Sequence, residues 1–162
     1  MTARSLMTTE IEVKTTEDRK SPAGDGLRSR AVLVGCRTRR EPIEQVEESL
    51  DELAHLAQTA GARPQETIKF DVDRIVPATF IGSGQAERLA EKAGAAEAEF
   101  IVFDNDLSPS QQRNIEKITD LMVMERTGLI LDIFASRAKT KEGKLQVELA
   151  QVEYLLPRLL GR

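Results

Sequence analysis

Basic side chains gather in one short stretch of an otherwise acidic chain. The stretch has four of them: Arg137, Lys139, Lys141 and Lys144. Glu142 is the one acid among them, so the stretch has a net charge of +3 (four minus one), whereas the whole chain of 162 residues has a formal net charge of −4. A chain of that balance is not expected to coat nucleic acid with its whole surface. Contact with phosphates must therefore be local, and this stretch either makes that contact or is only a solvated loop.

Three acids stand where apolar runs end. Asp104 and Asp106 follow the run 100–103, and Glu125 follows the run 121–124. Open α/β sheets place ligands at the carboxyl ends of their strands, where carboxylates can hold Mg²⁺. An aspartate between a strand and a helix is also ordinary turn chemistry. We favour the turn and predict no metal-binding residue, with these three acids as the alternative.

A glycine-rich turn, Gly82-Ser83-Gly84, precedes a predicted helix, where free backbone N–H groups could hold a phosphate. It lacks the lysine and hydroxyl pair of G-x-x-x-x-G-K-[ST] and the third glycine of G-x-G-x-x-G. Gly143-Lys144 does not complete a P-loop either, because Leu145 follows where Ser or Thr should bind magnesium. We favour a structural turn and predict no cofactor-binding residue. A nucleotide-binding α/β domain that uses this turn is the alternative function.

Nucleophilic catalysis has little support in the sequence. The single histidine, His55, lies among polar neighbours on a predicted helix, and the single cysteine, Cys36, lies in an apolar run where it should pack as a small core side chain. There is no C-x-x-C and no credible Ser-His-acid set. We therefore predict no catalytic residue and no enzyme activity for this chain.

Targeting signals are equally sparse. No run approaches the ~20 apolar residues that span a bilayer, and the first thirty residues mix both charges without an apolar signal segment. We expect a cytoplasmic protein. Residues 1–29 carry little apolar surface and include the linker-like run 21–26, which predicts a disordered tail.

Strand and helix patterns alternate through the first two thirds of the chain. Strands are predicted at 31–35, 67–72, 100–103 and 121–124, with helices between them. Ser108 to Gln111 has the pattern of a capping box at a helix start. This alternation predicts an α/β subdomain over 30–126 with a four-stranded, mainly parallel sheet flanked by helices.

The pattern changes after residue 126, where two helical stripes follow each other. The first stripe is Leu129, Ile130, Ile133 and Phe134, and the second is Leu145, Leu149, Val152, Leu155 and Leu159. The basic stretch lies between them, with Gly143 available to turn the chain. We predict an antiparallel α-helical hairpin subdomain over 127–162, with the basic residues at its tip and a kink at Pro157.

Four longer signatures stand in order along the chain: 78–84 (ATFIGSG), 107–114 (LSPSQQRN), 126–134 (RTGLILDIF) and 142–151 (EGKLQVELAQ). Together they resemble the N-terminal domain of HflX-type ribosome-associated GTPases over about residues 30–160. The resemblance implies a parallel α/β unit with an antiparallel helical pair that binds the large ribosomal subunit near the peptidyl transferase centre. It also implies a role in ribosome splitting or rescue, which is attributed to the whole protein. Because the predicted hairpin projects its basic tip and the resemblance places this end toward the large subunit, we predict rRNA contacts at Arg137, Lys139, Lys141 and Lys144.

In that family a separate domain hydrolyses GTP. The resemblance therefore implies that GTP and Mg²⁺ belong to a GTPase domain that would lie beyond residue 162 in cis, or act in trans on an interaction module. We expect no cofactor in this chain and no GTP hydrolysis by it alone, because it offers no cradle for the β and γ phosphates. The resemblance also suggests that the α/β part binds ATP, but no standard nucleotide-binding motif in the sequence supports this.

Overall fold

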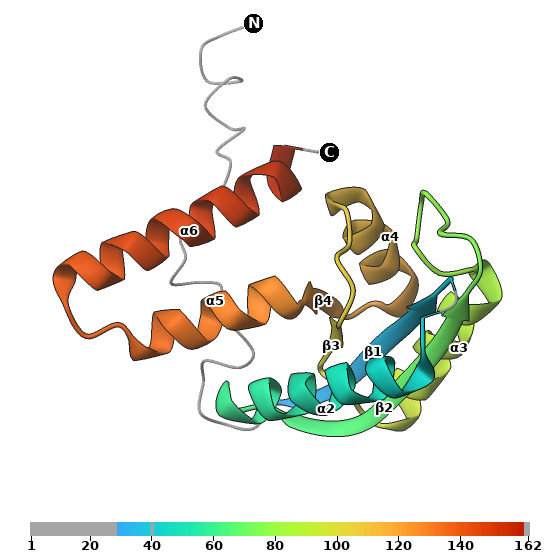
Figure 1. Ribbon diagram of the computed structural model, residues 1–162. Coiled ribbons are helices and arrows are strands. Elements are labelled where there is room, and N and C mark those ends of the chain that lie inside the picture. The colour runs from blue at the N-terminus through green and yellow to red at the C-terminus, as the bar shows by residue number, and fades with distance from the viewer. Residues whose placement is uncertain (1–28, 40, 161–162) are drawn as a thin grey trace, which may run out of the picture.

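The computed structural model describes residues 29–39 and 41–160 (Figure 1). The predicted disordered tail, apart from Ser29, lies outside these residues. Strands and helices alternate until the last two helices, in the order β1 (Arg30–Thr38), α2 (Ile43–Thr59), β2 (Arg63–Val72), α3 (Ser83–Ala95), β3 (Phe100–Phe103), α4 (Pro109–Thr119), β4 (Met122–Glu125), α5 (Arg126–Arg137) and α6 (Lys141–Leu160).

The four strands form one parallel sheet in the order β2-β1-β3-β4, which confirms the predicted fold class. Val34 of β1 stands between Ile68 of β2 and Phe103 of β3 in this register. β2 is an edge strand whose buried and less buried residues alternate toward its end, and it begins at Arg63 rather than at the predicted Thr67. The sequence did not predict this earlier start because proline, here Pro64, is disfavoured in strands except at a sheet edge, where its missing N–H is tolerated.

Helices cover both faces of the sheet (Figure 1). α2 and α5 pack on one face, over a core that includes Leu33, Phe100 and Leu129. α3 and α4 pack on the other, over a core that includes Val34 and Phe103. Consecutive residues of the central strands enter opposite cores, because strand side chains alternate between faces. That arrangement explains why the central strands read as continuous apolar runs.

The predicted capping box at α4 is confirmed. Ser108 Oγ accepts a hydrogen bond from the Gln111 N–H at 3.1 Å, and Gln111 Oε1 accepts one from the Ser108 N–H at 2.8 Å. Two of the N–H groups that a helix start leaves without backbone partners are thereby satisfied. The cap sets where α4 leaves the β3 end of the sheet.

Helices α5 and α6 form the predicted hairpin, but two of its details differ. The chain turns over residues 138–140, and Gly143 lies in the first turn of α6, where its N–H donates to Thr140 Oγ1 at 2.9 Å. Thr140 therefore caps α6, a role that its hydroxyl suits. The predicted stripe of α6 is only partly covered, since Leu155 is half-buried whereas Leu145, Leu149 and Val152 are exposed.

Close packing between α2 and the sheet depends on Gly35. An added Cβ at this position would lie 2.7 Å from Leu50 Cδ1 and 2.8 Å from Leu50 Cγ, inside van der Waals contact. Leu50 is itself buried in the core between α2 and the sheet, so it cannot swing into solvent. α2 sits at this height above β1 only because residue 35 has no side chain.

We predict that Gly35→Ala lowers the free energy of unfolding by about 1–3 kcal/mol, the usual cost of overpacking a core. Gly94→Ala is the matched control, because nothing lies within 4 Å of its added Cβ and alanine favours a helix. Urea unfolding followed by circular dichroism measures both. Equal stability of the two variants would contradict the proposed contact.

Candidate functional site

The four predicted rRNA-binding residues lie at the end of the hairpin that is farthest from the sheet (Figure 1). Arg137 ends α5, Lys139 lies in the turn, and Lys141 and Lys144 begin α6. All four side chains are exposed. We call this group the basic tip. How firmly the basic tip is oriented depends on how the opposite end of the hairpin is attached to the sheet.

A buried carboxylate anchors the other end of the hairpin. Glu125, at the end of β4, is 3% exposed. Its Oε2 accepts a hydrogen bond from the Leu107 N–H at 2.6 Å, and its Oε1 accepts one from the Tyr154 hydroxyl at 2.7 Å and forms an ion pair with Arg158. Tyr154 and Arg158 belong to α6, so this cluster joins the second hairpin helix to the sheet.

Arg158 distributes its donors over three elements. Its Nε donates to Gln112 Oε1 of α4 at 2.9 Å, its Nη1 donates to the Tyr154 carbonyl at 2.8 Å, and its guanidinium stacks 3.6 Å from the centre of the Tyr154 ring. Burial, followed by the hydrogen bond to Glu125, raises the pKa of Tyr154 above its ordinary value. The phenol thus stays protonated and able to donate.

This anchor lies well behind the basic tip. Arg158 lies seventeen positions after Lys141 along α6, which at a rise of 1.5 Å per residue is about 25 Å. The α5–α6 pair is held close at the anchor end, where a Cβ added to Gly128 of α5 would lie 3.2 Å from the Tyr154 hydroxyl. The tip is therefore presented on an arm that is fixed at its base.

A second ion-pair cluster fixes the start of α5. Arg126 Nε donates to Asp104 Oδ1 at 2.8 Å, and its Nη2 donates to the Ser49 carbonyl at 2.8 Å. The Ser49 hydroxyl in turn donates to Asp104 Oδ2 at 2.5 Å, and Glu52 lies 3.2 Å from Arg126 Nη1. These contacts join α2, the end of β3 and α5.

The three acids at the strand ends thus separate into different environments. The carboxylates of Asp104 and Glu125 are occupied by guanidinium groups and donors, whereas Asp106 is exposed. No three His, Cys, Asp or Glu side chains in the described ranges come together as a metal site. The sequence indicated where these acids lie but missed Arg126, Tyr154 and Arg158, which neutralise or hydrogen-bond them. The four-residue spacing of Tyr154 and Arg158 was the only local signal.

Asn105 bridges the carboxyl ends of β1 and β3, where the strand order reverses and where such sheets often bind ligands. Its Oδ1 accepts from the Cys36 N–H at 2.8 Å and its Nδ2 donates to the Cys36 carbonyl at 3.0 Å. The side-chain amide continues the hydrogen-bond ladder beyond β3. The backbone groups of Cys36 at this point are thereby paired within the chain.

The glycine turn also uses its groups internally. The Gly82 N–H donates to Gln85 Oε1 at 3.0 Å, and Gln85 Nε2 donates to the Asp71 carbonyl at 2.8 Å. Gln85 thus closes a cap on α3 and ties it to the end of β2. These contacts favour the structural interpretation of Gly82-Ser83-Gly84.

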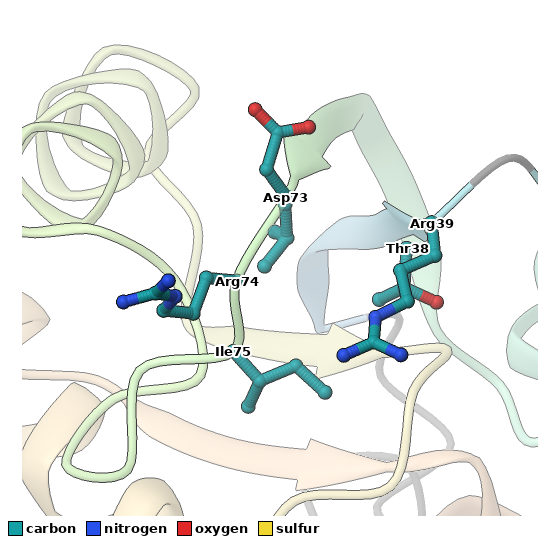
Figure 2. Close-up of a pocket in the computed structure, with 6 residues that line it drawn as sticks. Thr38, Arg39, Asp73, Arg74 and Ile75 are labelled. Atoms are coloured by element: carbon teal, nitrogen blue, oxygen red, sulfur yellow. The ribbon is translucent and has the colours of Figure 1, made fainter.

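A pocket of about 320 Å³ opens at the carboxyl ends of β1 and β2, lined by Thr38, Arg39, Val72, Asp73, Arg74 and Ile75. Figure 2 shows the Arg39 guanidinium turned toward Ile75, whereas Arg74 and Asp73 point in other directions. The charged groups do not converge on one point. The pocket therefore lacks the focused set of donors that would hold a phosphate.

The body and hairpin together define a class of protein: a parallel α/β module with an appended, anchored helical pair. Residues 47–135, more than half of the chain, match the family described as GTP-binding GTPase N-terminal, and residues 137–162 match the family described as GTP-binding GTPase Middle Region. The chain belongs to the HflX-type GTPase family, of which it represents the N-terminal domain. Among the described residues no helix is both long and apolar enough to cross a membrane.

Curated relatives agree with this assignment. GTPase HflX of Alkalihalophilus pseudofirmus is 46% identical over 131 residues, which cover 81% of this chain and 31% of the relative. GTPase HflX of Escherichia coli is 46% identical over 113 residues, 70% of this chain and 26% of the relative. The chain thus spans about a third of the length of these relatives or less.

A solved structure shares the fold. A GTP-binding protein from the hyperthermophilic archaeon Sulfolobus solfataricus, in complex with GDP, superposes with a TM-score of 0.63 at 23% identity. The match covers 82% of this chain and 39% of that one. At this identity the likeness concerns the fold alone.

We predict that Arg158→Ala lowers the free energy of unfolding by about 3 kcal/mol or more, because it leaves the buried Glu125 carboxylate without its cation. Glu99→Ala, which removes the exposed partner of Arg30, is the control and should cost less than about 1 kcal/mol. Urea titrations give both values. A loss at Arg158 no larger than the loss at Glu99 would show that the cluster does not anchor α6.

Cys36 supplies a second prediction. Burial, and secondarily the nearby Asp104 carboxylate, raises the pKa of Cys36 to about 12. The thiol therefore stays protonated near pH 8, where an unfolded cysteine with a pKa of about 8.5 is partly ionised. Iodoacetamide should label the native protein at pH 8 much more slowly than the urea-unfolded protein. Comparable rates would identify a reactive surface thiol instead.

Proposed function

We propose that this chain is the module by which an HflX-type GTPase binds the rRNA of the large ribosomal subunit during ribosome splitting or rescue, and that it is non-catalytic by itself. The observation that carries the proposal is the basic tip, exposed at the end of a hairpin whose base is braced by two guanidinium clusters. The family membership supports it. A ribosomal partner also implies a cytoplasmic location.

Charge distribution supports a local contact with RNA. The tip has a net charge of +3 on a chain of net −4, so a polyanion is attracted to the tip and repelled by much of the body. Lys and Arg contacts to phosphates release condensed counterions and position a protein without reading base sequence. A basic tip at the end of a narrow pair of helices could also reach phosphates that lie in a recess of the RNA, because only the two helices would have to enter the recess.

The anchor explains how such a tip would be oriented. Each hairpin helix is joined to the body by a guanidinium and a carboxylate, Arg126 with Asp104 and Arg158 with Glu125. A fixed base reduces the conformational entropy that the arm loses on binding. These ion pairs would therefore favour binding by holding the basic tip in a defined position.

For catalysis we propose that this chain does not hydrolyse GTP and needs no cofactor of its own. Two of its three strand-end acids, Asp104 and Glu125, hold guanidinium groups, and the Gly82 N–H donates to Gln85. GTP and Mg²⁺ would then be bound by a GTPase domain acting in cis or in trans.

We predict that replacing the four tip residues with alanine weakens binding to purified large ribosomal subunits by on the order of 100-fold at low salt. The slope of log K against log salt should shrink by about one unit for each phosphate that the variant no longer neutralises. Sedimentation with large subunits at several salt concentrations measures both. The fold should survive, because all four side chains are exposed.

The matched control removes the same charge from exposed positions of the body: Arg39, Arg74, Arg88 and Lys117. It should retain most of the affinity and most of the salt slope. If the two fourfold variants lose affinity equally, the contact is general electrostatics and not the tip. If neither loses affinity, the proposal fails.

A further inference from the structure

Helix α6 carries an apolar stripe that nothing in the described chain covers. Leu145, Leu149, Val152 and Leu156 are 56%, 59%, 48% and 49% exposed. The other exposed large apolar side chains of the described residues are distributed over other elements: Ile75, Ile118, Met122 and Phe134. A row of four on one helix is unlike the scattered apolar residues that are normal on a protein surface.

The spacing of these four residues is that of a helix-pairing surface. Successive steps of four, three and four residues place them at the a and d positions of a heptad repeat. The opposite side of α6 already has partners, because Tyr154 and Arg158 contact Glu125. The exposed stripe, which we call the α6 seam, therefore faces away from the anchor and is available to another helix.

Charges beside the α6 seam indicate what kind of helix fits. From residue 145 to residue 157 the only charged side chains are Glu148 and Glu153, and both are exposed. In the heptad frame they occupy g and e positions, which flank the apolar contact and select partners by charge. Over residues 145–157 a second copy of this chain would add two more carboxylates and no cation, so that four carboxylates would meet along the contact.

We propose that the α6 seam docks an amphipathic helix whose apolar a and d residues are flanked by lysine or arginine. The apolar contact supplies affinity, and pairing with Glu148 and Glu153 supplies selectivity. This surface is separate from the basic tip, which attracts anions from the end of the hairpin. The same helix thus offers one contact for a polyanion and another for a basic helix.

The probe is a synthetic helical peptide of about three heptads with leucine at a and d and lysine at e and g, compared with a peptide that has glutamate at e and g. Fluorescence anisotropy with the whole chain at low and high salt measures both affinities. The lysine peptide should bind at least tenfold more tightly than the glutamate peptide at low salt. The difference should shrink at high salt, because it comes from exposed charges.

Two variants test the surface itself. Leu149→Ser with Val152→Ser should abolish peptide binding, while Ile75→Ser with Ile118→Ser, which removes two exposed apolar side chains elsewhere, should not. Glu148→Lys with Glu153→Lys should reverse the preference, so that the glutamate peptide binds more tightly. This reversal is a gain of binding that an unfolded variant cannot produce. Circular dichroism checks that each variant remains helical.

Several outcomes would overturn the proposal. Binding of neither peptide would exclude a helix-docking surface, and equal binding of both would exclude the selection by charge. Loss of binding in the Ile75 and Ile118 variant would place the contact elsewhere. Concentration-dependent self-association in sedimentation equilibrium, abolished by the Leu149 and Val152 changes, would identify a second copy as the occupant instead.

Discussion

The side chain of Glu125, at the end of β4, is almost completely buried. A buried carboxylate is stable only where cations and hydrogen-bond donors replace the water that it loses. The three partners of Glu125 come from two places: the Leu107 N–H before α4, and the Tyr154 and Arg158 side chains of α6. The requirement to satisfy one side chain therefore joins the sheet, α4 and the hairpin. Without these partners α6 would be positioned only by its contacts with α5 and α4.

The chain uses its strand-end acids for structure where related architectures use that edge for ligands. Asp104 and Glu125 each hold one arginine, Arg126 and Arg158, at the start of α5 and near the end of α6. Asn105 completes the ladder at the carboxyl ends of β1 and β3. The carboxyl edge of the sheet thus serves as the platform to which the hairpin is attached. The exposed cations of the basic tip lie at the opposite end of the hairpin.

The hairpin consequently has three surfaces with different roles. Its inner face packs on the body through Leu129 and Tyr154, its tip carries the cations, and the outer face of α6 carries the apolar seam between two acids. Two of these surfaces face away from the described chain, which spans about a third of the curated relatives' length or less. The α/β body thus contains the buried core, whereas the exposed cations and the exposed apolar seam lie on the two appended helices.

The sequence by itself determined the parallel α/β order, the capping box at Ser108, the hairpin and the four basic residues at its tip, because each follows from local periodicity, helix-end chemistry or charge counted along the chain. It also placed Asp104 and Glu125 at strand ends. Only the tertiary structure decided what those acids do, because Asp104 meets Arg126 across 22 positions and Glu125 meets Arg158 across 33. The same dependence on contacts distant in sequence applies to α6. Its periodic stripe predicts an apolar helix face. Which residues of that face are buried depends on the orientation of the helix about its axis, which the contacts of Tyr154 and Arg158 with Glu125 fix.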